Sequence, residues 1–285
     1  MVVPRQVLPL GRSLRGILMQ LAARGVLLGL VLLYLVVCVA LFMFQRSLIY
    51  FPQPRSFEHD VAMLTLERPD ARVLVSTRTN DGSKALIYFG GNAEDVSVNL
   101  PGFSRVFPGA ALYCLHYRGY GGSSGKPTEA ALFADGLALF DEVHRKHSSV
   151  EIIGRSLGSS VAVYVASQRP VRRVVLVTPF DSVAAVAAQQ FRFIPVRWLL
   201  QDKFESWKYA PQITAPTLIV AAQRDEIVPA ANTQRLYQSF HAGIAKLIEV
   251  AGAGHNTISE DPDYWALLKG AAIKKGGRSS DRGGR

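Results

Sequence analysis

The chain begins with a long apolar run and then changes to short apolar segments separated by polar ones. The run extends from Gly25 to Gln45, 21 residues without a charge. At 1.5 Å rise per residue, a helix of this length matches a hydrocarbon core of about 30 Å. A buried core helix is usually shorter and has a polar edge. The pattern therefore predicts one transmembrane anchor at residues 25–45.

A cleaved signal peptide is the main alternative for this run. Cys38 and Ala40 form a small-residue pair of the kind found at cleavage sites. However, the apolar run continues through Phe44, which is a poor context for a signal peptidase, and Val37 is too large to precede a lipoprotein cysteine. The sequence therefore favours an uncleaved anchor.

After the anchor, short β-rich runs alternate with longer amphipathic runs. This alternation is typical of a mostly parallel sheet flanked by helices. Strands are predicted at 72–76, 85–89, 111–116, 150–153, 171–177, 217–222 and 246–250, and helices after Pro127, at 159–167, around 233–240 and at 264–272. The pattern predicts an α/β fold in one domain at residues 46–273, followed by a basic disordered tail at 274–285.

Residues 182–213 interrupt the alternation. They contain an Ala/Val-rich stretch and then an aromatic and basic stretch with Phe191, Phe193 and Trp198. The segment follows the predicted strand at 171–177. In a sheet of this type, insertions after that strand lie above the site of the nucleophile, which is predicted below to be Ser156. The segment is therefore predicted to form a short cap that controls acyl-group selectivity. The alternative is that these rings only pack the cap onto the sheet.

Charge and cysteine content exclude several classes of protein. The net charge is +10, but residues 1–24 and 271–285 each carry +4, so the domain between them is nearly neutral. This distribution excludes a nucleic-acid-binding domain and indicates a membrane flank and a solvated tail. The two cysteines, Cys38 and Cys114, belong to no CxxC or Cys/His cluster, so we expect no metal site and no cofactor.

The charges around the anchor predict its orientation. Four arginines precede the span, whereas Arg46 and Arg55 follow it. The positive-inside rule then places residues 1–24 in the cytoplasm and the main domain on the other side of the membrane.

Two segments match the G-x-S-x-G pattern of a nucleophile elbow, a strained strand-to-helix turn that exposes a serine. In Gly154–Gly158 (GRSLG), Ser156 follows a predicted strand and precedes a predicted helix. In Gly121–Gly125 (GGSSG), Ser123 lies in a glycine-rich loop followed by a proline, which an elbow helix could not accept. Ser156 is therefore the predicted nucleophile and Ser123 a turn residue.

A serine hydroxyl needs a base and an orienting acid, which in this type of hydrolase follow in the order Ser, Asp or Glu, His. Asp225 follows the strand at 217–222 and is the predicted acid, with Glu226 beside it and Asp181 after the preceding strand as alternatives. His255 follows the strand at 246–250 through a glycine-rich loop and is the predicted base. The other histidines are out of order or lie near helix ends: His59, His116, His144, His147 and His241.

An oxyanion hole requires two backbone N–H groups. One is predicted at Leu157, directly after the nucleophile. The other is predicted at Asn92, in a Gly90-Gly91 loop that is expected to open a helix after the strand at 85–89.

Several motifs together make the chain resemble the single-pass, membrane-anchored α/β-hydrolase-domain proteins, a branch similar to serine aminopeptidase-like and eukaryotic depalmitoylating serine hydrolases. The resemblance covers about residues 45–273. The motifs are Tyr88–Asp95 (YFGGNAED), Tyr117–Gly122 (YRGYGG) with Pro127–Glu129, Gly154–Ser159 (GRSLGS), Pro179–Ser182 (PFDS), Arg224–Pro229 (RDEIVP) and Gly252–Asn256 (GAGHN). The chain departs from the family pattern at Gly90, where many relatives carry histidine, and at His116, where an aspartate is frequent.

The resemblance implies hydrolysis of an ester, thioester or amide through an acyl-enzyme, without naming the substrate. Arg155 in the elbow and the aromatic cap could favour an anionic or lipid-like acyl substrate, but a structural salt bridge and core packing explain them equally well. A catalytically silent, membrane-tethered interaction protein on a hydrolase fold is the alternative from another class.

Overall fold

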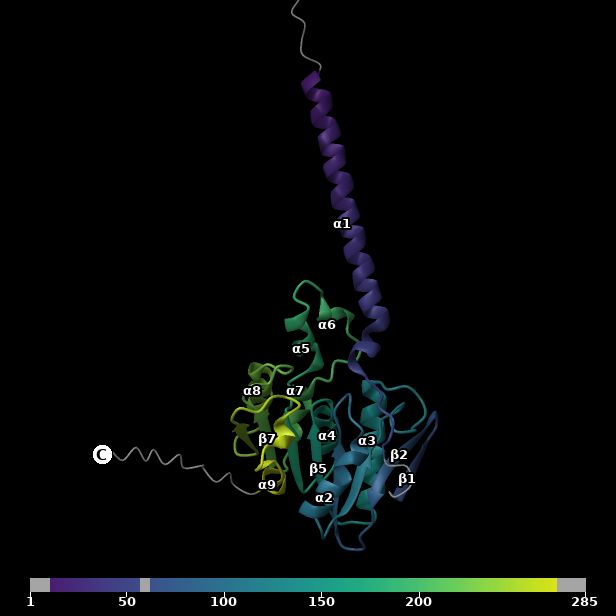
Figure 1. The fold of residues 1–285 in the computed structure, drawn as a ribbon, viewed down its shortest axis with the longest axis vertical. Coiled ribbons are helices and arrows are strands. Elements are labelled where there is room, and N and C mark those ends of the chain that lie inside the picture. The colour runs from purple at the N-terminus through teal and green to yellow at the C-terminus, as the bar shows by residue number, and fades with distance from the viewer. Residues whose placement is uncertain (1–10, 57–61, 271–285) are drawn as a thin grey trace, which may run out of the picture. The chain divides into compact units, whose positions relative to one another are not determined.

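The structure is a computed structural model that describes residues 11–56 and 62–270 (Figure 1). The predicted tail at 274–285 and the first ten residues of the predicted N-terminal segment lie outside the described residues. The chain divides into two units, Met1–Gln45 and Arg46–Arg285.

The first unit is dominated by a single helix, α1 (Gly11–Ile49), whose last four residues belong to the second unit. In the part of the chain that the structure describes, one helix, Gly16–Ile49, is long and apolar enough to cross a membrane. The predicted span at 25–45 lies within it, and the helix continues past both limits. The helix extends beyond the uncharged run because its flanks also favour helix formation: arginine and leucine, which are frequent in both flanks, are good helix formers.

The second unit is built on an eight-stranded sheet. The strands are β1 (Ala62–Arg68), β2 (Ala71–Arg78), β3 (Lys84–Phe89), β4 (Ala111–Leu115), β5 (Ser149–Arg155), β6 (Arg173–Val177), β7 (Thr217–Ala222) and β8 (Ala245–Val250). Their spatial order is β1-β2-β4-β3-β5-β6-β7-β8. The pairs β1–β2 and β2–β4 are antiparallel, and all other neighbours are parallel. The predicted mostly parallel sheet is confirmed.

Helices cover both faces of this sheet. The main helices are α2 (Leu100–Val106), α3 (Glu129–His144), α4 (Leu157–Gln168), α8 (Ala230–Ser239) and α9 (Tyr264–Lys269). Strand side chains alternate between two apolar clusters: Ile87 belongs to the cluster that includes residues of α3, α4 and α8, whereas Leu86 and Tyr88 belong to the cluster that includes residues of α2 and α9. The segment at 182–213 forms short helices: α5 (Val183–Gln190), α6 (Val196–Leu199), α7 (Ser206–Tyr209) and the 3₁₀ turn η2 (Ala210–Gln212).

Two elements differ from the sequence prediction. Strand β1, at the edge of the sheet, was not predicted. The loop after β3 does not open a helix at Asn92: the chain turns there, and a 3₁₀ turn, η1 (Val96–Asn99), begins four residues later. The reason is local, because the Asp95 carboxylate accepts the backbone N–H of Ser97 and so caps the turn at that point.

The sheet topology determines where a site can form. Strand β3 lies between β4 and β5. From β3 the chain goes to β4 on one side of β3, and the following strand, β5, pairs with the other side of β3. Such a switch point leaves a crevice at the carboxyl ends of the two strands. The loop after β3 and the turn after β5 therefore meet at one edge of the sheet.

Candidate active site

Ser156 lies alone between a strand and a helix. Strand β5 ends at Arg155 and α4 begins at Leu157, while Ser156 has φ 49° and ψ −116°. A positive φ is costly for a residue with a side chain, so surrounding structure must maintain it. The Ser156 N–H donates to the Val177 carbonyl of β6 at 2.9 Å, which fixes the turn to the sheet.

The two elbow glycines are required by close packing. A Cβ atom at Gly158 would lie 2.1 Å from the carbonyl oxygen of Phe89 and 2.5 Å from that of Gly90. A Cβ atom at Gly154 would lie 2.5 Å from the carbonyl oxygen of Gly158. These are backbone atoms that a side-chain rotation cannot move. The absence of side chains therefore lets α4 approach the end of β3 and brings the β3 loop beside the serine.

We expect Gly158→Ala to destabilise the domain by about 3 kcal/mol, the upper end of the range for overpacking, because the new methyl group meets fixed carbonyl oxygens. The midpoint of thermal unfolding of the purified full-length protein measures this effect. Gly109→Ala is the matched control, since a Cβ atom there has no heavy atom within 4 Å. Equal midpoints for the two variants would contradict the close approach of α4 to β3.

The structure brings the predicted serine, histidine and aspartate into one hydrogen-bonded chain. The His255 Nε2 atom lies 3.0 Å from Ser156 Oγ. On the other side of the ring, Nδ1 lies 2.8 and 2.9 Å from the two oxygens of Asp225. The side chains of His255 and Asp225 are only 5% and 7% exposed, so water competes little with these bonds.

Backbone groups hold the Asp225 carboxylate in place. Its Oδ1 atom accepts the N–H groups of Ile227 at 3.0 Å and Val228 at 2.7 Å. The carboxylate therefore needs no reorientation to accept the Nδ1–H of His255. This preorganisation favours the imidazole tautomer whose Nε2 lone pair faces the serine.

The two alternative acids have other partners. The Oε2 atom of Glu226 accepts the backbone N–H of His255 at 3.1 Å, not the ring. Asp181 forms a 2.7 Å ion pair with Arg235 and accepts a hydrogen bond from the Asn232 amide at 2.7 Å. Asp181 thus links the end of β6 to α8, and of the three candidate acids only Asp225 bonds the His255 ring.

Two of the other histidines are engaged elsewhere. The Nε2 atom of His116 lies 2.8 Å from Ser76 Oγ, and burial lowers the pKa of this histidine to about 4. Its ring stays neutral and occupies space that only Gly121 leaves open. His147, which the sequence places near a helix end, is buried, and its Nε2 atom lies 3.0 Å from Tyr113 Oη. His144 and His241 are exposed, and His59 lies outside the described residues.

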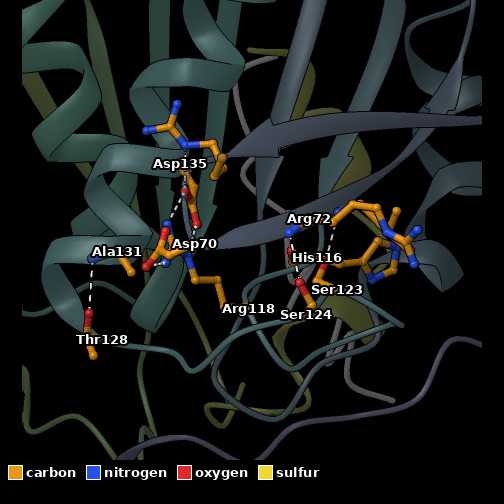
Figure 2. A network of polar contacts seen from close by, with 11 residues as sticks. Asp70, Arg72, His116, Arg118, Ser123, Ser124, Thr128, Ala131 and Asp135 are labelled. Carbon is orange, nitrogen blue, oxygen red and sulfur yellow. Dashed lines mark hydrogen bonds and ion pairs between the residues drawn. The ribbon is translucent and has the colours of Figure 1, made fainter.

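Ser123 is a buried turn residue. Its Oγ atom donates to the His116 carbonyl at 3.0 Å and accepts the Leu74 N–H at 2.8 Å (Figure 2). In the same network, the Arg118 guanidinium pairs with Asp135 at 2.8 Å and with Asp70 at 2.6 Å (Figure 2). The YRGYGG motif and the serine that follows it therefore form a turn, in which Ser123 bonds the backbone carbonyl of His116, whereas the His116 ring bonds Ser76.

The loop after β3 lies beside the nucleophile. A Cβ atom at Gly91 would lie 3.9 Å from Ser156 Cβ. The Gly91 N–H is already used, because it donates to Glu94 Oε2 at 2.7 Å. The Asn92 carbonyl accepts hydrogen bonds from the Phe51 N–H at 3.0 Å and from Tyr120 Oη at 2.7 Å. Among the described residues no acceptor bonds the Asn92 N–H. Asn92, which follows Gly91 in this loop, therefore keeps a backbone donor available.

Glu94 is a residue whose role the sequence analysis missed. Its carboxylate accepts hydrogen bonds from Tyr88 Oη and from the Asn99 amide, both at 2.6 Å, besides the Gly91 N–H. Burial raises the pKa of Tyr88 well above its usual value, so its hydroxyl stays protonated and donates. In the sequence, the one sign of this role is that Glu94 follows Gly91 by three residues. The sequence does not show its other two partners, because Tyr88 belongs to β3 and Asn99 to η1.

Arg155 also belongs to this framework. Its guanidinium lies 3.9 Å from the Glu94 carboxylate and donates to the Asn256 carbonyl at 3.4 Å, and its side chain is 16% exposed. It therefore connects the elbow, the β3 loop and the histidine loop. Of the two explanations considered for Arg155, the contacts favour the structural salt bridge.

The fold and this arrangement define a class of protein. Residues 133–270 match the family model described as "Serine hydrolase". The structure is similar to an esterase from Pyrococcus furiosus, with a TM-score of 0.61 and 18% identity over 77% of this chain and 96% of the esterase. At that identity the likeness supports the fold alone.

Two further proteins are similar in sequence. An uncharacterized protein of Mycobacterium tuberculosis is 34% identical over 248 residues, 80% of this chain and 84% of the relative. An uncharacterized membrane protein of Saccharomyces cerevisiae is 30% identical over 184 residues, 61% of this chain and 64% of the relative. The chain belongs to the serine hydrolase family with the α/β-hydrolase fold.

Proposed function

We propose that the chain is a membrane-anchored enzyme that hydrolyses an ester, thioester or amide through an acyl-enzyme on Ser156. His255 is the general base, Asp225 orients it, and the N–H groups of Asn92 and Leu157 stabilise the oxyanion. The single observation that carries the proposal is the hydrogen-bonded chain from Ser156 Oγ through His255 to Asp225. Family membership supports the same class of reaction.

The reaction follows from the roles of these groups. As Ser156 Oγ attacks the acyl carbon, His255 Nε2 removes its proton, and the carbonyl oxygen becomes an oxyanion. When the tetrahedral intermediate collapses, the imidazolium gives that proton to the leaving oxygen, sulfur or nitrogen. Water then attacks the acyl-enzyme with His255 again as base, and a carboxylic acid leaves. Asp225 remains ionised and stabilises the imidazolium.

Reaction with a fluorophosphonate, which phosphonylates an activated serine, tests the proposal. We expect the folded full-length protein to be labelled. If folded protein stays unlabelled, the alternative applies: a catalytically silent, membrane-tethered interaction protein on a hydrolase fold.

The apolar helix supports membrane anchoring. Its uncharged run of 21 residues spans the hydrocarbon core, and a relative from yeast is named a membrane protein. The arginine bias, four before the run and two after it, supports a cytoplasmic N-terminus and a catalytic domain on the opposite side.

We expect a C-terminal alkaline phosphatase fusion of the full-length chain to be active, because this reporter folds only after export. The activity of the fusion in intact cells is the measurement. The control is a fluorescent reporter of the cytoplasmic type at the same position, which should stay dark. The reverse pattern would place the active site in the cytoplasm and direct the substrate search to acylated cytoplasmic proteins.

A further inference from the structure

The connection between α5 and α6 and the short helix α6 itself each expose one large aromatic ring to solvent. Phe193 is 90% exposed and Trp198 is 88% exposed, more than any other large apolar side chain among the described residues. Arg192 and Arg197 stand beside them in the chain and are also exposed. We call residues 191–198 the aromatic turn. These two rings do not pack the cap onto the sheet, which was one of the two roles considered for them.

The cap is attached to the segment that follows the apolar run. The Arg46 guanidinium lies 3.1 Å from the Asp202 carboxylate. Tyr50 Oη donates to the same carboxylate at 3.1 Å, and the Tyr50 ring meets the Phe204 ring edge to face. The Asp202 side chain is only 7% exposed, so this contact belongs to the packed interior of the domain and is not a loose surface contact. The part of the cap segment around Asp202 therefore lies at Arg46.

This attachment determines how far the aromatic turn lies from a bilayer. Arg46 is the first charge after the uncharged run, and an arginine at the end of a span keeps its guanidinium at headgroup level. Asp202 contacts the Arg46 guanidinium, so Asp202 also lies at headgroup level. Trp198 precedes Asp202 by four residues, which reach at most about 14 Å even when fully extended. The aromatic turn is thus within reach of the interfacial region.

The side chains of the aromatic turn fit that region. Tryptophan is enriched at membrane interfaces because its ring is apolar and its N–H prefers a polar neighbour. Arginine beside it matches the negative surface potential of anionic lipids. Two nearly fully exposed rings next to two arginines are unfavourable in water but suited to the boundary between headgroups and acyl chains.

We propose that the aromatic turn contacts the bilayer surface, with Phe193 and Trp198 at the interface and Arg192 and Arg197 at anionic headgroups. This contact holds the cap against the membrane surface. The proposal rests on the proposed membrane anchoring and is independent of the catalytic assignment.

Quenching of tryptophan fluorescence by brominated lipid tests the contact. The chain has three tryptophans, so Trp207→Phe with Trp265→Phe leaves Trp198 as the only reporter. The full-length variant is reconstituted into vesicles of phosphatidylcholine and phosphatidylglycerol, with or without bromine on the upper acyl chain. We expect blue-shifted emission that bromine strongly reduces.

A second single-tryptophan variant is the matched control. Trp198→Phe with Trp207→Phe leaves Trp265, which packs edge to face on Phe103 at α2, so bromine should not change its emission. Equal Trp198 emission in both kinds of vesicle, with the protein still bound after an alkaline carbonate wash, would overturn the contact while leaving the anchoring intact. Release by the wash would refute the anchoring and the contact with it.

Discussion

Ser156→Ala should abolish fluorophosphonate labelling and lower turnover of any substrate ester about 10⁶-fold, because the loss of a triad nucleophile removes the acyl-enzyme route. The serine Oγ lies 3.0 Å from His255 Nε2, so the base remains in place but has no proton to remove. The proposed oxyanion donors are backbone groups and also remain. The measurement is labelling and ester hydrolysis by the full-length protein, with circular dichroism to check the fold.

Ser123→Ala is the matched control for this experiment. Ser123 carries the other G-x-S-x-G match, but its hydroxyl bonds the His116 carbonyl and the Leu74 N–H in a buried turn. We expect full labelling of folded Ser123→Ala, with only a loss of stability from the two broken hydrogen bonds. If Ser123→Ala prevents labelling and Ser156→Ala does not, the choice of elbow is wrong.

Asp225→Asn should leave the protein folded and lower kcat about 10⁴-fold, the effect of the same change in a triad protease. An asparagine can still accept the N–H groups of Ile227 and Val228 through its oxygen, so the loop should keep its shape. It no longer stabilises the imidazolium, and its amide N–H favours the tautomer that carries the proton on Nε2, facing Ser156. Single-turnover kinetics with a chromogenic ester measure the loss.

Asp181→Asn distinguishes the roles of the two acids that follow neighbouring strands, Asp181 after β6 and Asp225 after β7. It weakens the ion pair with Arg235, which joins the end of β6 to α8, so we expect a lower unfolding temperature with nearly unchanged kcat. A large loss of kcat in folded Asp181→Asn, together with a mild effect of Asp225→Asn, would assign the orienting role to Asp181.

The local pattern of the chain predicts the fold class and the elbow. Alternation of short apolar runs with amphipathic ones predicts a parallel sheet with helices, because strand and helix periodicities are local properties. The uncharged run predicts the apolar helix for the same reason. Ser156 could be distinguished from Ser123 by its immediate neighbours, a strand before it and a helix after it. Strand β1 was missed because its residues, AMLTLER, belong to an edge that only the neighbouring β2 defines.

Partner choice, in contrast, is a property of the tertiary structure. Chain order leaves three acids open for the triad, and the structure separates them by what each carboxylate touches: the His255 ring for Asp225, the His255 N–H for Glu226 and Arg235 for Asp181. Ser156 and His255 are 99 residues apart and meet only because β5 and β8 belong to one sheet.

The same division applies to Glu94 and to the aromatic turn. The sequence shows an acid behind two glycines and aromatic residues in an interrupted segment, but not that Glu94 holds the β3 loop or that Phe193 and Trp198 face solvent. Hydrogen bonding and exposure depend on the distances between elements that are far apart in the sequence, and differences of tenths of an ångström to a few ångströms in those distances decide them. Packing of the whole domain sets those distances, whereas apolar spacing along the chain sets only which elements form.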